Sequence, residues 1–245
     1  GEVVVPVVLA LEWFARVART FRPDLHLSRI KDLNVLKGIR LQDFDGQGDR
    51  LVLTCKQLRN SAGAVLGLTL ESPAGVVHYR AEAEMTEGEL VAMNDTPPRL
   101  ALADWGGAPI YGDVLFHEDE FQVVQELDGV GDEGISGTIK GVHTAKWAWE
   151  NWNTDVAAMD GGLQLILLWA RSKMGGSVLP MAIGEARMST DAPPQGRIRC
   201  VARCRAESKS RGLADVVFHT ESGERFAELN NVQVILRPGT PVADA

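Results

Sequence analysis

The chain has 245 residues, of which 45% are hydrophobic and 24% charged, a composition that is typical of a globular protein and excludes a disordered or fibrous chain. Its 25 Lys and Arg residues against 33 Asp and Glu residues give a net charge of -8, the wrong sign for a protein whose main partner is nucleic acid. Three cysteines are too few for a disulfide framework and form no zinc pattern, which predicts a reducing, cytoplasmic setting, and the apolar run at 3–11 is far shorter than the roughly 20 residues that span a membrane.

The first half of the chain predicts one helix followed by an antiparallel meander. Apolar residues wrap most of the circumference of segment 6–20, which indicates a buried helix. Pro6 suits the first helical position, because proline lacks the N–H that would be unpaired there. Short runs rich in Val, Leu, Ile and Thr, separated by turn residues, predict strands at 30–41, 51–58, 65–70 and 76–83.

The second half repeats this order after a polar connection. Residues 86–109 are rich in Gly, Pro, Asn and Asp, which is typical of a segment that runs over the surface. A weak likeness between LEWFAR at 11–16 and LLWAR at 167–171 favours a duplication. The patterns predict a helix over about 155–173, and strands at 115–126, 134–141, 178–188, 197–206, 214–220 and 226–236.

A long apolar helix wrapped by a curved antiparallel sheet is called a hotdog, so the two repeats predict an α+β double hotdog. We expect an N-terminal hotdog at 1–90, a linker at 91–110, a C-terminal hotdog at 111–238 and a tail at 239–245. The second repeat shows a strand before its helix and the first does not. We therefore expect the opening strand of the first repeat to lie upstream of residue 1.

One acidic residue of the second predicted helix is a candidate for chemistry. Asp160 and Gln164 are four positions apart and therefore lie side by side on one helix face, where they can share a hydrogen bond. Two interpretations stay open: a solvated acid in the first turn, or a buried carboxyl whose pKa desolvation raises while the helix N-terminus lowers it. Gly161 and Gly162 favour the second, because glycines inside a helix cost roughly 1 kcal/mol each and the close approach of a ligand would explain them.

Residues 160–164, D-G-G-L-Q, resemble the D-x-x-x-Q element of the dehydratase domains of modular polyketide synthases and polyunsaturated fatty-acid synthases, which are double hotdogs. Three further stretches agree and together cover nearly the whole chain in order. GEVVVP at 1–6 resembles the second half of that family's H-x-x-x-G-x-x-x-x-P motif. LFH at 115–117 and FQ at 121–122 resemble its L-F-H-G-P-x-F-Q segment, and VLKGI at 35–39 is similar to a strand common in these domains.

The resemblance implies a dehydratase that removes water from a β-hydroxyacyl thioester on an acyl carrier protein and leaves a trans-2-enoyl thioester. Asp160 would donate a proton to the leaving hydroxyl and Gln164 would orient Asp160, while the general base, a His, would lie ahead of Gly1 and outside this sequence. Backbone N–H groups around Gly1, at the start of the first helix, would polarise the thioester carbonyl. The implied substrate-binding residues are Gly1, Pro6, Tyr111, Phe116, His117 and Phe121.

The resemblance also implies no metal or redox cofactor, a substrate carried on phosphopantetheine, and the acyl carrier protein and neighbouring synthase domains as partners. Whether two copies pair into a homodimer stays open. Glu118-Asp119 stands where the family has Gly-Pro, and together with the missing His this favours an alternative, a non-catalytic pseudo-dehydratase that serves as scaffold or acyl-binding domain. A hotdog thioesterase, in which a helix carboxylate activates water, is the third candidate.

Two groups of side chains each have two open interpretations, one structural and one functional. Aromatic residues around the start of the second helix either close a core or line an acyl tunnel: Trp105, Tyr111, Trp147, Trp149 and Trp152. Basic residues at period two on strand 197–206 form either a solvated face or a docking surface for the acidic carrier protein, extended by Lys209 and Arg211. These are Arg197, Arg199, Arg203 and Arg205.

Overall fold

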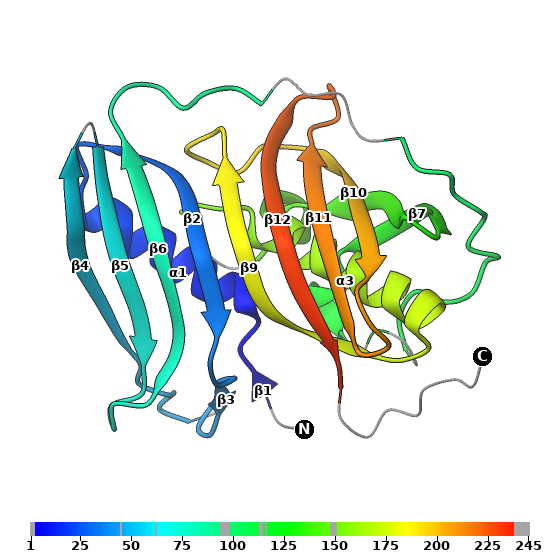
Figure 1. The fold of residues 1–245 in the computed structure, drawn as a ribbon, viewed down its shortest axis with the longest axis horizontal. Helices are drawn as coiled ribbons and strands as arrows, with labels where there is room; N and C mark the ends of the chain where they lie inside the picture. Colours follow the sequence, from blue (N-terminus) through cyan, green and yellow to red (C-terminus); the bar gives the residue numbers. More distant parts are fainter. Residues whose placement is uncertain are drawn as a thin grey trace.

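The computed structural model describes residues 3–44, 46–61, 63–93, 99–112, 115, 117–147 and 151–237. Its helices and strands are β1 (Val3–Val4), α1 (Val7–Phe21), β2 (His26–Val35), β3 (Arg40–Leu41), β4 (Val52–Ser61), β5 (Gly63–Glu71), β6 (Val77–Thr86), the 3-10 helix η1 (Asp119–Phe121), β7 (Val124–Gly131), β8 (Gly134–Lys140), α2 (Val142–Ala145), α3 (Val156–Met174), β9 (Val178–Met188), β10 (Arg197–Ala206), β11 (Arg211–His219) and β12 (Arg225–Leu236). Ten of the described strands form one antiparallel sheet in the order β4-β5-β6-β2-β9-β12-β11-β10-β8-β7. The two long helices lie on the same face of this sheet, α1 against the strands of the first half and α3 against those of the second (Figure 1).

Helix α1 is held by the apolar side chains that the sequence pattern places around it. Leu11 and Phe14 are fully buried, and the helix contacts β2, β4, β5 and β6. Pro6 has φ -61° and ψ 143°, an extended conformation, so it is the N-cap and the helix begins one residue later than predicted. Strands β4, β5 and β6 pair consecutively, which confirms this part of the meander, whereas β2 pairs with β6 and not with β4.

The predicted strand at 30–41 is wrong in its extent, because the chain leaves the sheet partway. Strand β2 ends at Val35, and the N–H groups of Leu36 and Lys37 then donate to the His78 carbonyl instead of continuing a ladder. Only Arg40–Leu41 pairs again, with β1. The run is therefore two strands that belong to two different sheets.

The predicted strand at 115–126 is also wrong, since residues 119–121 form a 3-10 helix and β7 begins only at Val124. Asp119 has φ 47°, in the left-handed region that Asp tolerates better than most residues. The Gln122 side-chain amide donates to the His117 carbonyl over 3.1 Å. These local bonds turn the chain where apolar residues alone predicted pairing.

Helix α3 crosses the second half with every residue from Val156 to Ala170 buried. Asp155 is its N-cap and accepts a hydrogen bond from the Ala158 N–H over 2.9 Å. Gly175, with φ 73°, ends the helix in the left-handed conformation. The predicted helix is confirmed to within one residue at each end.

The glycine pair on α3 allows the helix to lie close to the sheet. A Cβ on Gly162 would come 2.7 Å from the Phe218 ring on β11, and one on Gly161 would come 3.1 Å from the Ile139 side chain on β8. Protein side chains therefore occupy the space in front of both glycines. The expectation that the glycines make room for a ligand is wrong.

The two halves of the chain are joined both in the sheet and between the helices. Strands β2 and β9 pair antiparallel, so the sheet continues from one half into the other. Behind the sheet, Glu12 of α1 has no exposed surface and accepts hydrogen bonds from backbone and side-chain groups of Asn153 and Thr154, at 2.8 to 3.2 Å. These two residues directly precede the cap of α3, so Glu12 ties α1 to the start of α3.

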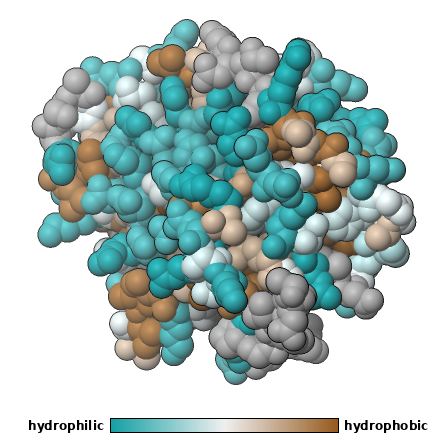
Figure 2. Space-filling view, turned by 45° about the vertical axis from the view of Figure 1, so that its right-hand side comes forward, coloured by the Kyte–Doolittle hydropathy of each residue, from teal (hydrophilic) through white to brown (hydrophobic). Residues whose placement is uncertain are grey.

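The described parts of the connection between β6 and β7 contact strands of the second half. They form single bridges from Met93 to Arg225 and from Ala103 to Val130. The face that comes forward in Figure 2 is mostly hydrophilic, with apolar residues in small, separate patches. All three cysteines carry free thiols, which confirms that they form no disulfide framework.

Candidate active site

Asp160 and Gln164 lie one turn apart on α3 and share the hydrogen bond that their spacing predicts. Gln164 Nε2 donates to Asp160 Oδ2 over 2.7 Å, and the two residues are 4% and 1% exposed. Asp160 lies in the second turn of the helix, so the interpretation as a solvated first-turn acid is wrong. Burial raises the pKa of the Asp160 carboxyl to about 6, although the Gln164 N–H favours the ionised form.

Gln164 is also held by the segment that precedes β7. Its Oε1 accepts a hydrogen bond from the Tyr111 hydroxyl over 2.8 Å, and its Nε2 donates to the Phe121 carbonyl over 2.8 Å. The Tyr111 oxygen in turn accepts from the Val124 N–H over 2.6 Å. A chain of hydrogen bonds therefore runs from the first residue of β7 to the carboxyl of Asp160.

His117 is the titratable side chain that the loop 117–123 brings next to this carboxyl. Its Nε2 lies 3.9 Å from Asp160 Oδ2, and its side chain is 15% exposed. Burial lowers the pKa of His117 and raises that of Asp160. Both shifts favour uncharged forms, so a carboxyl that can give a proton stands beside a neutral imidazole, which is the chemistry of general acid and base catalysis.

Asp155 is a second buried carboxyl at the start of α3, which no motif in the sequence indicates. Its Oδ1 accepts from the backbone N–H groups of Ala158 and Val142, which joins the start of α3 to the start of α2. Burial raises the pKa of Asp155 to about 7 against the effect of those two N–H groups. Its position directly before the apolar run of α3 is a capping signal, and burial itself leaves no mark in the sequence.

The predicted aromatic cluster forms in part. Trp147 packs between Phe121 and Trp152, with ring centroids 4.9 Å and 5.8 Å apart. Its indole N–H donates to the Glu120 carbonyl over 2.9 Å, so the tryptophan covers the 3-10 helix and fixes the position of Phe121. Trp149 lies outside the described residues.

Pro6 and Trp105 have structural contacts of their own. Pro6 caps α1 in the first half of the chain. Trp105 lies in the connection before β7, where its indole N–H donates to the Ala108 carbonyl over 2.8 Å. Gly1 and Phe116 lie outside the described residues, so their assignment to substrate binding stays a prediction.

The arginine row of β10 lies on the face of the sheet opposite the helices, since the residues between these arginines are buried. Several of the arginines form ion pairs with acidic neighbours, which offset part of the positive charge of the row. The recorded pairs are Arg197 with Glu126 at 3.0 Å, Arg199 with Asp128 at 3.2 Å and Arg205 with Glu207 at 3.6 Å. The surface is therefore less basic than the spacing alone indicates.

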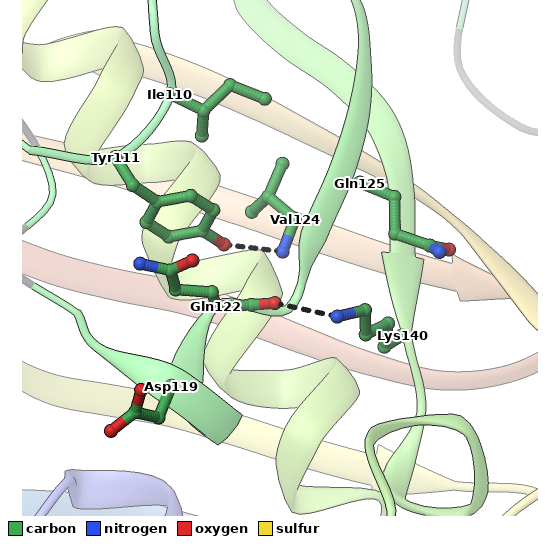
Figure 3. A pocket seen from close by; sticks show the side chains of 7 residues that line it. All are labelled: Ile110, Tyr111, Asp119, Gln122, Val124, Gln125 and Lys140. Atoms are coloured by element: carbon green, nitrogen blue, oxygen red, sulfur yellow. Dashed lines mark hydrogen bonds between the residues drawn. The ribbon is translucent and has the colours of Figure 1, made fainter.

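An open cavity of about 490 Å³ lies beside Tyr111, which is one of the hydrogen-bond partners of Gln164 (Figure 3). Tyr111 forms part of its wall and directs its hydroxyl toward the Val124 N–H. Lys140 brings a positive charge to the cavity and donates from Nζ to the Gln122 carbonyl over 3.2 Å. The lining residues are Ile110, Tyr111, Asp119, Gln122, Val124, Gln125 and Lys140.

Comparison with known proteins identifies the family of this chain. The model described as "Polyketide synthase dehydratase N-terminal domain" matches residues 107–238, more than half of the chain. The chain belongs to the polyketide synthase dehydratase family. That finding confirms the family that the motifs at 115–122 and 160–164 indicate.

A curated relative of this dehydratase domain is a polyunsaturated fatty acid synthase chain from Thraustochytrium sp., with 24% identity over 248 residues. The alignment covers 94% of this chain and only 8% of the relative, so the chain spans less than a tenth of that protein.

Within the described residues, no helix is both long and apolar enough to cross a membrane.

Solved structures show the same fold at low sequence identity. A trans-AT polyketide synthase dehydratase domain from Brevibacillus brevis has a TM-score of 0.73 at 16% identity, and covers 97% of this chain and 87% of its own. The dehydratase domain from the CurJ module of curacin polyketide synthase has a TM-score of 0.71 at 13% identity, with 98% and 84% covered. A trans-acyltransferase polyketide synthase enoyl-isomerase has a TM-score of 0.70 at 16% identity, with 95% and 90% covered. The predicted α+β double hotdog is confirmed.

Proposed function

We propose that this dehydratase domain is catalytic, and that it eliminates water from a β-hydroxyacyl thioester on the phosphopantetheine arm of an acyl carrier protein to leave a trans-2-enoyl thioester. The observation that carries the proposal is the buried carboxyl of Asp160, whose pKa is raised to about 6 and which Gln164 orients. A carboxyl with such a pKa can donate a proton near neutral pH. Membership of the dehydratase family supports the proposal that this proton serves the elimination of water.

In the proposed reaction a base takes the α-proton, the electron pair of that C–H bond forms the α–β double bond, and the C–O bond to the β-hydroxyl breaks. Asp160 gives its proton to the departing hydroxyl, which leaves as water. The carboxylate that remains accepts the Gln164 N–H at 2.7 Å, and this bond stabilises its charge.

The resemblance assigns the base to a His ahead of Gly1, and His117 then lines the substrate site beside the acid. The elimination changes no oxidation state, so it needs no redox cofactor, and the proposal, like the resemblance, includes no metal.

The test is the substitution Asp160→Asn in the complete protein, with 3-hydroxybutyryl pantetheine thioester as the substrate and mass spectrometry to follow the loss of water. Asparagine keeps the size and the hydrogen-bonding oxygen but has no acidic proton, so we expect turnover to fall by about 10²- to 10⁴-fold with unchanged circular dichroism. The matched control is Asp132→Asn, because the Asp132 side chain is 93% exposed and pairs only with Lys173 in the recorded contacts. Turnover of Asp160→Asn at the wild-type rate would overturn the proposal.

The same assay separates the other candidate functions. Release of free thiol from the substrate, without loss of water, would identify a thioesterase. A wild-type protein that binds the thioester and leaves it unchanged would be a pseudo-dehydratase.

We also propose the acyl carrier protein and neighbouring synthase domains as partners, which the occurrence of the related sequence in a far longer synthase chain supports. The basic row of β10 is the proposed docking surface. Its ion pairs with Glu126, Asp128 and Glu207 would then exchange for acidic groups of the carrier protein.

A further inference from the structure

The orientation of Gln164 depends on a tyrosine 53 positions away in the sequence. The Tyr111 hydroxyl has one hydrogen and two recorded partners, the Val124 N–H at 2.6 Å and Gln164 Oε1 at 2.8 Å. A backbone N–H can only donate, so the tyrosine oxygen accepts from Val124 and its single hydrogen goes to Gln164. The group of Gln164 that faces Tyr111 must therefore be the carbonyl oxygen.

The Phe121 carbonyl fixes the same amide from the other side. It can only accept a hydrogen bond, and the Gln164 nitrogen donates to it over 2.8 Å. Both contacts select the same one of the two amide orientations, and the second N–H of that nitrogen then points at Asp160 Oδ2 over 2.7 Å. A reversed amide would set its oxygen against two acceptors, the Phe121 carbonyl and the Asp160 carboxylate.

We infer that Tyr111 is a positioning residue that holds Gln164 with its N–H, and not its carbonyl, toward Asp160. Tyr111 acts through Gln164, because its hydroxyl bonds to Gln164 and Val124. Burial raises the pKa of Tyr111, so the hydroxyl keeps its hydrogen over the whole range in which Asp160 titrates. The catalytic meaning of this inference rests on the proposed function, whereas its structural content does not.

The other charged groups described below either point away from Asp160 or bond to other partners. Among the described residues, His117 approaches Asp160 to 3.9 Å. Asp155, at the start of α3, directs its carboxyl to backbone N–H groups, and Glu12 of α1 faces residues 153–154. Lys140 of β8 bonds to the Gln122 carbonyl, and the arginines of β10 lie on the opposite face of the sheet. A change in the titration of Asp160 on loss of the Tyr111 hydroxyl is therefore attributed to Gln164.

The test is Tyr111→Phe, which removes the hydroxyl and keeps the ring. Without the hydroxyl the Gln164 oxygen loses its donor and only the Phe121 carbonyl still holds the amide. The N–H bond that stabilises the Asp160 carboxylate is then held less firmly, and we expect the titration midpoint of Asp160 to rise by about 1 pH unit. Carbon-13 NMR of the aspartate carboxyls measures this midpoint without any turnover, and Asp160→Asn assigns the signal.

Tyr79→Phe is the matched control, because Tyr79 is the other of the two tyrosines, is 2% exposed, and has its hydroxyl 3.5 Å from the Val5 carbonyl in the first half. An unchanged midpoint in Tyr111→Phe, or an equal rise in Tyr79→Phe, would overturn the inference.

A double substitution tests whether Tyr111 acts through Gln164. Gln164→Met removes the amide at similar length and should raise the Asp160 midpoint by itself, after which adding Tyr111→Phe should change it no further. Additive shifts would contradict the inference.

If Tyr111→Phe does not fold, a measurement on the wild-type protein can still overturn the inference. The side-chain amide signals of Gln164 should follow the Asp160 titration, and signals that ignore it would overturn the inference.

The pH dependence of turnover gives a second readout. Turnover that needs protonated Asp160 falls as pH rises through about 6, and Tyr111→Phe should move this fall to higher pH by the same amount as the NMR midpoint. A merely structural role would lower turnover without moving the fall, and would contradict the inference. Full activity of Asp160→Asn would end the dehydratase proposal and leave the NMR result standing, so the two failures are distinguishable.

Discussion

Each of the two helical glycines meets a different part of the sheet, and the distances rank the two positions. A Cβ on Gly162 would lie 2.7 Å from the Phe218 ring, which is fully buried, whereas a Cβ on Gly161 would lie 3.1 Å from the Ile139 side chain. Replacing a helical glycine by alanine gains about 1 kcal/mol of helix stability. Forcing a methyl group into a packed core costs about 1 to 3 kcal/mol, so the net sign depends on the space available.

We therefore expect Gly162→Ala to lower the free energy of unfolding by about 1 to 2 kcal/mol and Gly161→Ala to leave it within about 1 kcal/mol of wild type. Urea unfolding followed by tryptophan fluorescence measures both. Each variant serves as the control for the other, because they carry the same substitution on adjacent residues. Equal stability of the two variants would contradict the packing argument.

The start of α3 contains a carboxyl whose ionisation opposes folding. Burial raises the pKa of Asp155 from 3.8 to about 7, so between about pH 4 and pH 7 the folded state holds a proton that the unfolded state has lost. The stability that this proton contributes is fully present below about pH 4. It is lost as pH rises through about 7.

Asp155→Asn should remove this dependence, because asparagine is uncharged in both states and its oxygen can still accept from Ala158 and Val142. We expect the variant to gain stability relative to wild type between pH 4 and pH 8, on the order of 4 kcal/mol at the upper end. Urea unfolding at several pH values measures the difference, and the comparison with wild type cancels the similar contribution of Asp160. Stability curves that stay parallel over this range would show that Asp155 is not buried in the protonated form.

At the scale of the whole molecule, the two hotdogs are joined too closely to act as separate units. Strands β2 and β9 share a backbone ladder, and the buried Glu12 bonds to residues 153–154 across the two halves. Separating the halves would expose two strand edges and a carboxylate with lost partners. We expect calorimetry to show one cooperative transition with equal calorimetric and van't Hoff enthalpies. Two resolved transitions would contradict this coupling.

Much of the fold could be predicted from the sequence, because helices and strands follow from patterns among residues that are close together in the chain. The helical period predicts α1 and α3 to within one residue of their starts, and alternation with turn residues predicts most strands. The hydrogen bond between Asp160 and Gln164 also follows from a local rule, because any two residues four positions apart on a helix are neighbours. Motifs of the same short range indicate the family that the comparison shows.

The long-range contacts of the site were decided only by the tertiary structure. Tyr111 reaches Gln164 across 53 positions and Glu12 reaches Asn153 across 141, and no local period relates residues so far apart. The burial that raises the pKa of Asp160, and the packing that requires Gly162, both arise when α3 lies down on the sheet. By itself the sequence determined that Asp160 and Gln164 lie side by side on one helix, whereas docking of the two halves decided which other side chains surround Asp160, because packing and desolvation depend on the whole molecule.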